Sequence, residues 1–349
     1  MTSRQILRDV PLVDGHCHTV LTAPPTDPAG FAALLTESDR PAPPGVSYAD
    51  SPLGLAVRRW CAPVLDLPMG AALDDYLAQR QRLGDSEVAS RLLSSAVLAA
   101  LLVDTGIGGD DTSEPSDLSV AAGAAVHQVV RLERVAERLA AEGVSADDFA
   151  EAYVAALGAA SADAVGVKSI LAYRYGFELP PHEPEPAAVR SAAEVWLREP
   201  TLRLTDPTLL GYLLWCGVRR GLPVQLHTGF GDADIRLRSV DPALLQPFLE
   251  AVEPFGTPIV LLHCYPYQRS AGWLAATYPH VYADVGLTLS HVGGRAPDVL
   301  AEFLELAPFG KVVFSTDAYR LPELYAVGAA QFRWALEVVL GRWITQHVV

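Results

Sequence analysis

Ile259-Val260-Leu261-Leu262-His263 is an apolar run that ends in a histidine. The same arrangement occurs at Pro223–His227, and Asp317 follows the run 312–316. A short, continuous apolar run is typical of a parallel strand that is buried on both faces. In a barrel of such strands the carboxyl ends meet at one mouth, where active sites lie. Metal-binding side chains at successive strand ends therefore indicate a parallel barrel with a polar site at its mouth.

Strand-like runs alternate with helical patterns along the whole chain, which predicts parallel strands joined by helical crossovers. We expect eight strands, at Val10–Asp14, Val97–Val103, Gln128–Leu132, Ala164–Leu171, Pro223–Leu226, Ile259–Leu262, Val281–Val285 and Val312–Phe314. The clearest helices are predicted at Pro207–Arg220, Pro242–Val252, Pro297–Leu306 and Leu324–Leu340. The predicted fold class is therefore α/β, a (β/α)8 TIM barrel.

The spacing of the strand ends favours one barrel domain over residues 1–349 rather than two smaller domains. His227 and His263 are 36 residues apart, and His263 and Asp317 are 54 apart with one further strand between them. The first distance is one strand-to-strand step and the second is two steps of 27 residues each. Both step lengths are close to the roughly 31 residues that a barrel spends on each unit. His18 to Lys168 takes 150 residues for three steps, which is too many. The excess lies in residues 19–86, a Pro-rich and partly helical segment that we interpret as an insertion after strand 1, on the side of the active site.

Composition restricts the partners of the protein. Half of the 349 residues are hydrophobic and the formal net charge is -15. An acidic surface repels phosphate backbones and anionic lipid, so we expect a small-molecule substrate, no nucleic acid and no membrane. The four cysteines form no CxxC pair, and residues 1–10 hold no signal-peptide-like apolar stretch. We therefore expect a cytoplasmic protein, and leave a homo-oligomer open.

His16 and His18 form the sharpest motif, Val13-Asp14-Gly15-His16-Cys17-His18 at the end of the first strand. Strand side chains alternate, so the two imidazoles point to one side while Cys17 points away. Two neighbouring imidazoles provide half of a metal site. The alternative is two unrelated histidines, one of which caps the strand.

Lys168 stands out because only two of the 26 basic residues are lysines. This chain uses arginine almost everywhere, yet it places a lysine inside an apolar strand. A buried lysine must be paired, neutral or chemically altered. Carbamylation by CO2 would make it an anion that bridges two metal ions. The alternative is a lysine that extends to the barrel mouth or pairs with a carboxylate.

These residue types indicate hydrolysis by a metal-activated water. A divalent metal lowers the pKa of water and polarises a substrate carbonyl, and Asp317 is placed to take the proton and pass it on. The chain has no GxSxG, HExxH or GxxxxGK[ST] motif, so serine-hydrolase and nucleotide-binding activities lack support. His291 is the next candidate for the base.

With these residues in view, the chain resembles the amidohydrolase superfamily over nearly its full length. Within the amidohydrolase 2 group it is most similar to the amidohydrolase-like domain of FluG and nodulin glutamine synthetase-like fusion proteins. The stretches that carry this resemblance are 167–176, 226–232, 262–286 and 315–323. The resemblance implies that His16, His18 and Asp317 bind one metal ion, zinc or manganese. It also implies that Lys168, if carbamylated, bridges to a second ion held by His227 and His263.

The leading functional hypothesis is cleavage of a C–N amide bond in a small molecule, with γ-glutamyl or related amides indicated by the resemblance alone. One alternative is a nonhydrolytic metal-dependent decarboxylase or isomerase of the same superfamily, which uses the same ligands. A second is a noncatalytic binding protein on a decayed barrel. Four loop residues are candidates for binding a substrate carboxylate, although each is equally consistent with a solvated loop: Arg174, Tyr175, Arg269 and Arg320.

Overall fold

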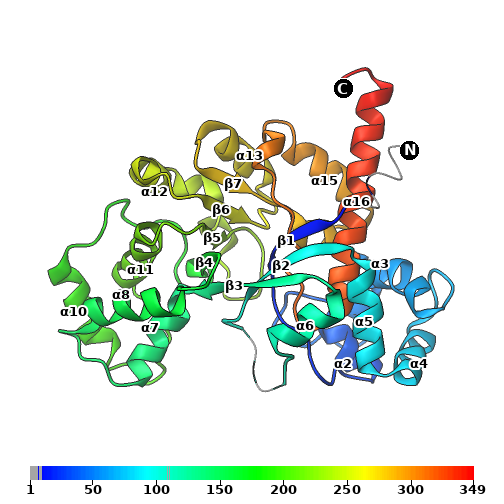
Figure 1. Ribbon diagram of the computed structural model, residues 1–349, viewed down its shortest axis with the longest axis horizontal. Coiled ribbons are helices and arrows are strands. Elements are labelled where there is room, and N and C mark those ends of the chain that lie inside the picture. The colour runs from blue at the N-terminus through cyan, green and yellow to red at the C-terminus, as the bar shows by residue number, and fades with distance from the viewer. Residues whose placement is uncertain (1–6, 8–9, 108, 110) are drawn as a thin grey trace.

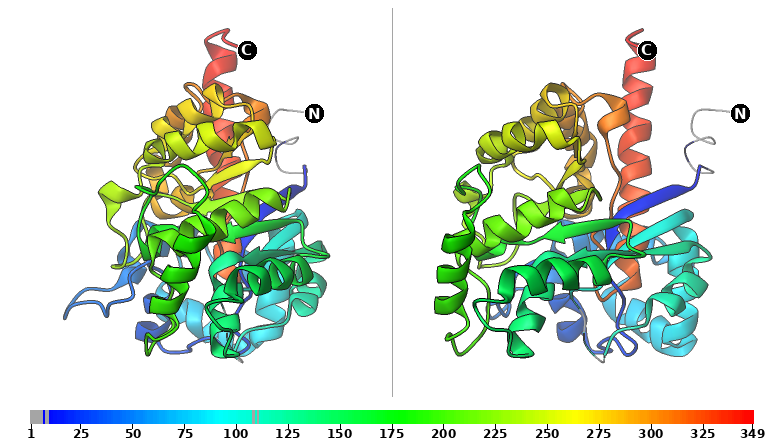
Figure 2. Two further views of the ribbon diagram at one scale, coloured as in Figure 1. Left: turned by 90° about the vertical axis from the view of Figure 1, so that its left-hand side faces the viewer. Right: turned by 60° about the vertical axis from the view of Figure 1, so that its left-hand side comes forward.

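The computed structural model describes the chain except for residues 1–6, 8–9, 108 and 110. Its centre is a parallel sheet of seven strands that pair in chain order. The strands are β1 (Leu12–Cys17), β2 (Leu98–Asp104), β3 (Ala125–Arg131), β4 (Gly166–Ser169), β5 (Val224–His227), β6 (Ile259–Leu262) and β7 (Val281–Ala283). The sheet is curled, and helices lie around its outside (Figures 1 and 2). Seven of the predicted strands are confirmed within a few residues.

The predicted eighth strand, Val312–Phe314, is wrong as a regular strand. Its backbone nevertheless bridges the two edges of the sheet: Val313 N donates to Ala283 O at 3.0 Å, and Gly15 N donates to Phe314 O at 2.9 Å. The ladder is short because the amide of Val312 donates to the carbonyl of Phe309 in the preceding turn at 3.3 Å, and the amide of Thr316 donates to the Asp14 carboxylate at 2.9 Å. We call residues 312–318 the closing segment, since they lie between β7 and β1.

The helices that connect the strands follow from ordinary start signals. In α11 (Pro207–Arg219), Pro207 occupies the first turn and the Asp206 side chain accepts from the amides of Thr208 and Leu209. The predicted helix Pro242–Val252 is a 3-10 turn over Pro242–Leu245 that continues as α12. The other crossover helices are α6 (Pro115–Ala122), α7 (Leu132–Ala141), α8 (Phe149–Ala160), α9 (Leu171–Arg174), α10 (Pro186–Trp196), α12 (Gln246–Val252), α13 (Gln268–Thr277), α14 (Gly286–His291), α15 (Ala296–Phe303) and α16 (Pro322–Thr345).

The segment between β1 and β2 contains four α-helices: α2 (Pro28–Ala33), α3 (Pro52–Trp60), α4 (Leu73–Leu83) and α5 (Asp85–Ser95). They enclose an apolar cluster of their own, which includes Phe31, Tyr76 and Val327 of α16. Helix α16 also packs directly against α3 and α5 of this segment. The packing therefore ties this segment to the C-terminal helix. That residues 19–86 are an insertion stays a prediction.

The main core is separate from that cluster. It fills the space between β3–β7 and their crossover helices with buried side chains such as Leu132, Phe149, Leu213 and Phe303. Among the helices of the described residues, none is both long and apolar enough to cross a bilayer.

Candidate metal centre

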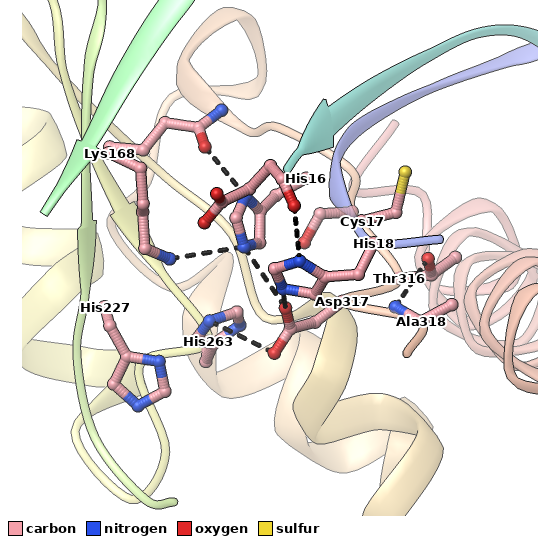
Figure 3. A network of polar contacts seen from close by, with 12 residues as sticks. His16, Cys17, His18, Lys168, His227, His263, Thr316, Asp317 and Ala318 are labelled. Carbon is pink, nitrogen blue, oxygen red and sulfur yellow. Dashed lines mark hydrogen bonds and ion pairs between the residues drawn. The ribbon is translucent and has the colours of Figure 1, made fainter. Parts of the chain in front are cut away.

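The predicted ligands meet at the carboxyl ends of the strands. His16 lies in β1, His227 ends β5, His263 follows β6, and Asp317 belongs to the closing segment. Lys168 extends from β4 into the same cluster (Figure 3). Figure 3 also shows Cys17 pointing away from the rings of its two neighbouring histidines. Its thiol is fully buried and lies 3.6 Å from the carbonyl oxygen of Leu102.

Asp317 lies at the centre of this cluster. Its Oδ1 is 3.2 Å from Nε2 of His16 and 3.3 Å from Nε2 of His18. Its Oδ2 is 3.5 Å from Nε2 of His263. Burial works to raise the pKa of Asp317, but the imidazoles of His263, His16 and His18 hold it well below its usual range. The carboxylate is therefore ionised, and ring nitrogens from two separate segments, the end of β1 and the end of β6, face it.

His18 shows what these ring nitrogens offer to the carboxylate. Its Nδ1 lies 2.8 Å from the backbone carbonyl of Asp104, which can only accept a hydrogen bond. The proton of a neutral His18 is therefore on Nδ1, and Nε2 presents a lone pair to Asp317. A lone pair that faces a carboxylate oxygen is stabilised only by a cation between them. A metal ion fits this arrangement, and a carbonyl behind the imidazole is the usual way of orienting such a ligand.

His263 provides an independent test of the fit. The residue is fully buried, and neither ring nitrogen has a hydrogen-bond partner among the described residues. Buried polar atoms without partners are rare and call for an explanation. A metal ion bound by one of these nitrogens explains the orphaned ring.

The pKa values of the histidines agree with a ligand role. Burial, assisted by the charge of Lys168, lowers the pKa of His16 to about 4 and that of His227 to about 3. Burial also lowers the pKa of His263 well below its usual value. Metal ions bind neutral imidazole, so these rings are available as ligands at neutral pH.

Lys168 is 1% exposed, and its Nζ lies 3.3 Å from Nε2 of His16. Among the described residues, no carboxylate lies within ion-pair distance of this amine. Burial lowers its pKa to about 8, with Arg131 adding to the shift and Asp317 and Asp104 opposing it. A substantial fraction of the amine is therefore neutral near pH 8.

His227 lies next to His263 in the cluster. Its Nε2 is 3.0 Å from the carbonyl oxygen of Phe230, and its ring centroid is 4.6 Å from that of His263.

Two buried carboxylates hold the backbone that carries the ligands. Asp14 accepts from the amide and hydroxyl of Thr316, at 2.9 and 2.6 Å. Asp284 accepts from the amide of His263 at 3.2 Å and from the hydroxyl of Ser315 at 3.0 Å. Burial raises the pKa of Asp14 to about 7 and that of Asp284 to about 6. These contacts stabilise the left-handed backbone of His263 (φ 71°) and Asp317 (φ 50°), which non-glycine residues seldom adopt.

A cavity of about 520 Å³ opens above the cluster. Of the four proposed substrate-binding residues, Arg174 and Arg320 line it, and Arg174 also pairs with Glu137 at 3.0 Å. Tyr175 and Arg269 do not line it. Arg269 is 59% exposed and pairs with Glu305 at 2.8 Å. The structure therefore brings only two of these four residues to the cavity.

His291, the alternative base, is not part of the cluster. Its Nε2 lies 3.3 Å from Glu37 Oε1, and the ring lines a neighbouring cavity together with Phe230 and Tyr265.

Sequence reasoning missed Asp104 and Arg131, which end β2 and β3. Arg131 Nη2 lies 2.6 Å from Oδ2 of Asp104, and the amide of Gly106 donates to Oδ1 at 2.8 Å. Asp104 could join His16 and His18 as a third ligand. Both of its oxygens are already occupied, however, whereas those of Asp317 face ring nitrogens, so we favour Asp317 as the ligand. Applying the strand-end criterion to the predicted strand Val97–Val103 would have found Asp104, which follows it directly, but not Arg131, which lies inside the predicted strand Gln128–Leu132.

Comparison with known proteins identifies the family. The family model described as Amidohydrolase matches residues 122–337. The chain belongs to the amidohydrolase 2 family. It is 28% identical to Protein fluG of Emericella nidulans over 385 aligned residues, which cover 96% of this chain and 43% of FluG. This amidohydrolase chain thus spans less than half the length of that relative.

Two solved structures resemble the amidohydrolase chain. One is a "putative metal-dependent hydrolase" from Lactobacillus casei ATCC 334, with a TM-score of 0.86 and 29% identity over 96% of this chain and 89% of that one. The other is glucuronate isomerase from Caulobacter crescentus, with a TM-score of 0.65 and 15% identity over 99% and 88% of the two chains. The second likeness shows the fold alone.

Proposed function

We propose that this chain is a metal-dependent hydrolase that cleaves a C–N amide bond of a small molecule with an activated water. The observation that carries the proposal is the position of the Asp317 carboxylate, which is faced by Nε2 atoms of His16, His18 and His263. Membership of the amidohydrolase family and the likeness to a metal-dependent hydrolase support it.

We assign His16, His18 and Asp317 to one divalent ion, zinc or manganese. A carbamylated Lys168 with His227 and His263 would hold a second ion. A bound divalent ion lowers the pKa of water and polarises a carbonyl group. Asp317, ionised and next to this position, accepts the proton of the attacking water and delivers it to the leaving amine. The buried cluster holds these groups in place, and the cavity above it receives the substrate.

The cavity is lined by four arginines and by several acidic side chains, and we propose that Arg174 and Arg320 among them bind an anionic group of the substrate. A guanidinium matches the geometry of a carboxylate, so Arg174 and Arg320 are assigned to a substrate carboxylate. Amides of γ-glutamyl type carry such a group, and the likeness to FluG agrees with this class. We further propose a cytoplasmic enzyme on a (β/α)8 barrel, closed by residues 312–318 and carrying an insertion at 19–86.

The test combines metal analysis with a panel of γ-glutamyl, N-acyl and dipeptide amides. We expect one or two equivalents of divalent metal and release of an amine from at least one class. Active protein without metal would overturn the proposal. Interconversion of a uronate without hydrolysis of any amide would instead favour the isomerase alternative.

A further inference from the structure

Gln225 lies directly behind the proposed metal ligand His16. It occupies β5, two residues before His227, and is 4% exposed. Its Oε1 is 2.8 Å from Nδ1 of His16, and its Nε2 donates to the backbone carbonyl of Gly15 at 2.6 Å. Both contacts join β5 to β1 across the interior of the curled sheet.

The carbonyl of Gly15 fixes the orientation of the Gln225 amide. A carbonyl oxygen can only accept a hydrogen bond, so the amide nitrogen must face it. The amide oxygen then faces Nδ1 of His16, and because this oxygen also only accepts, Nδ1 must carry a proton. A neutral imidazole has one N–H, which leaves Nε2 of His16 with a lone pair.

A second neighbour agrees with this assignment. Before any carbamylation the amine of Lys168 lies 3.3 Å from Nε2 of His16, and in its ammonium form this amine can only donate a hydrogen bond. An unprotonated Nε2 satisfies it. The same nitrogen lies 3.2 Å from Asp317 Oδ1.

We propose that Gln225 is a positioning residue that holds His16 in the Nδ1–H tautomer and so directs its Nε2 lone pair to the metal. The proposal rests on the proposed function in that His16 is taken as a ligand. His18 is oriented by the carbonyl of Asp104, which no substitution removes. His16 reaches a backbone carbonyl only through the Gln225 amide, so the acceptor for its Nδ1–H comes from one replaceable side chain.

The test compares Gln225→Met with Gln331→Met. Methionine matches glutamine in length and removes the amide. Gln331 is a suitable control because it is 2% exposed and hydrogen-bonded to Trp60, Leu289 and Gly293, away from the metal centre. The ¹⁵N shifts of ring-labelled histidines in the metal-free proteins report the His16 tautomer, with His16→Asn providing the assignment. Chelator competition gives the affinity for zinc.

In the parent protein we expect the Nδ1–H tautomer. In Gln225→Met we expect a shift toward Nε2–H and a loss of zinc affinity of about 10- to 100-fold, as is usual when a residue that orients a ligand is replaced. Gln331→Met should match the parent in both measurements. A Gln225→Met protein with the parent tautomer and parent affinity would overturn the proposal.

Gln225→Glu keeps the test decisive if the methionine variant fails to fold. It preserves an acceptor for Nδ1, so His16 should retain the Nδ1–H tautomer, and loss of that tautomer would count against the proposal. Absence of zinc binding in the parent protein would contradict the proposed function. The tautomer measurement on metal-free protein would still test Gln225.

Discussion

The carboxylate of Asp317 faces three imidazole nitrogens. Replacing Asp317 by asparagine tests the role of its negative charge. Asp317→Asn keeps the size of the side chain but removes the base. We expect turnover to fall by about 10²- to 10⁴-fold, the usual contribution of a general base. Metal content measured on the same preparation distinguishes loss of the base from loss of the ion. An Asp317→Asn protein that retains both metal and normal turnover would show that another group carries the proton.

The pKa of Lys168, lowered to about 8 by burial, makes carbamylation depend on pH. Only the neutral amine reacts with CO2, and the neutral fraction rises as pH increases through about 8. Bicarbonate should therefore accelerate activation of metal-free protein by zinc, and more strongly at pH 8 than at pH 6. Lys168→Ala is expected to bind one ion and to lose the bicarbonate effect. Unchanged activity in this variant, with two bound ions, would exclude the carbamate.

For single residues, the sequence predicts the candidate metal ligands better than it predicts the residues that orient these ligands. The histidines were found because strand alternation and strand ends place a side chain without knowledge of its neighbours. Gln225 was not found, because its role consists of contacts with Gly15 and His16, more than 200 residues away. Asp14 belongs to the histidine motif, yet nothing in that motif indicates that the Asp14 carboxylate accepts hydrogen bonds from Thr316.

Among the elements, α4 and α16 are joined by an ion pair between Arg80 and Glu323. Nε of Arg80 lies 2.7 Å from Oε1 of Glu323, although out of line for a hydrogen bond, and the hydroxyl of Tyr76 donates to the same oxygen at 3.0 Å. Glu323 is completely buried. Because Glu323→Gln leaves a buried guanidinium uncompensated, we expect the free energy of unfolding to fall by about 3–5 kcal/mol.

Urea unfolding measures the decrease in the free energy of unfolding of Glu323→Gln. The double variant Arg80→Met/Glu323→Met is the control. Replacing both charges with apolar side chains is often neutral or stabilising, so the double variant should recover most of the loss. Equal destabilisation of the single and double variants would show that packing, rather than the unpaired charge, is responsible.

The helices between β1 and β2 show why the element prediction was incomplete there. The segment was predicted to be Pro-rich and partly helical, without bounds for its helices, and in the structure Pro28 and Pro52 begin α2 and α3. The side chains of Asp27 and Ser51 cap these helices by accepting from the amides of Gly30 and Gly54. Proline in the first helical turn is favourable, so the same residue type marks a helix start or a loop depending on its neighbours. The eighth strand did not form for a different reason: the amides of Val312 and Thr316, on either side of the short ladder, donate to Phe309 and to the Asp14 carboxylate.

At the scale of the whole molecule, stability and metal binding depend on how closely the closing segment packs against its neighbours. A Cβ atom added at Gly286 would lie 1.7 Å from the backbone oxygen of Ser315, so Gly286→Ala must displace the segment that carries Asp317. Overpacking of this kind costs about 1–3 kcal/mol or more. We expect a lower free energy of unfolding and loss of bound metal. Gly310→Ala, where nothing lies within 4 Å, is the control and should behave like the parent protein. Normal metal content in Gly286→Ala would contradict the close packing described for this segment.

The meeting of β1 with residues 312–318 also has a consequence for biosynthesis. A ribosome makes His16 and His18 well before Asp317, while domains generally begin to fold from their N-terminal side during translation. Until residues 312–318 emerge, the free edge of β1 lacks the backbone partners that it has in the finished protein, and such edges are prone to pair with other chains. On the proposed ligand set, an ion cannot bind His16, His18 and Asp317 together until residues 312–318 have been made, and the unfinished edge is where a nascent-chain chaperone would be needed.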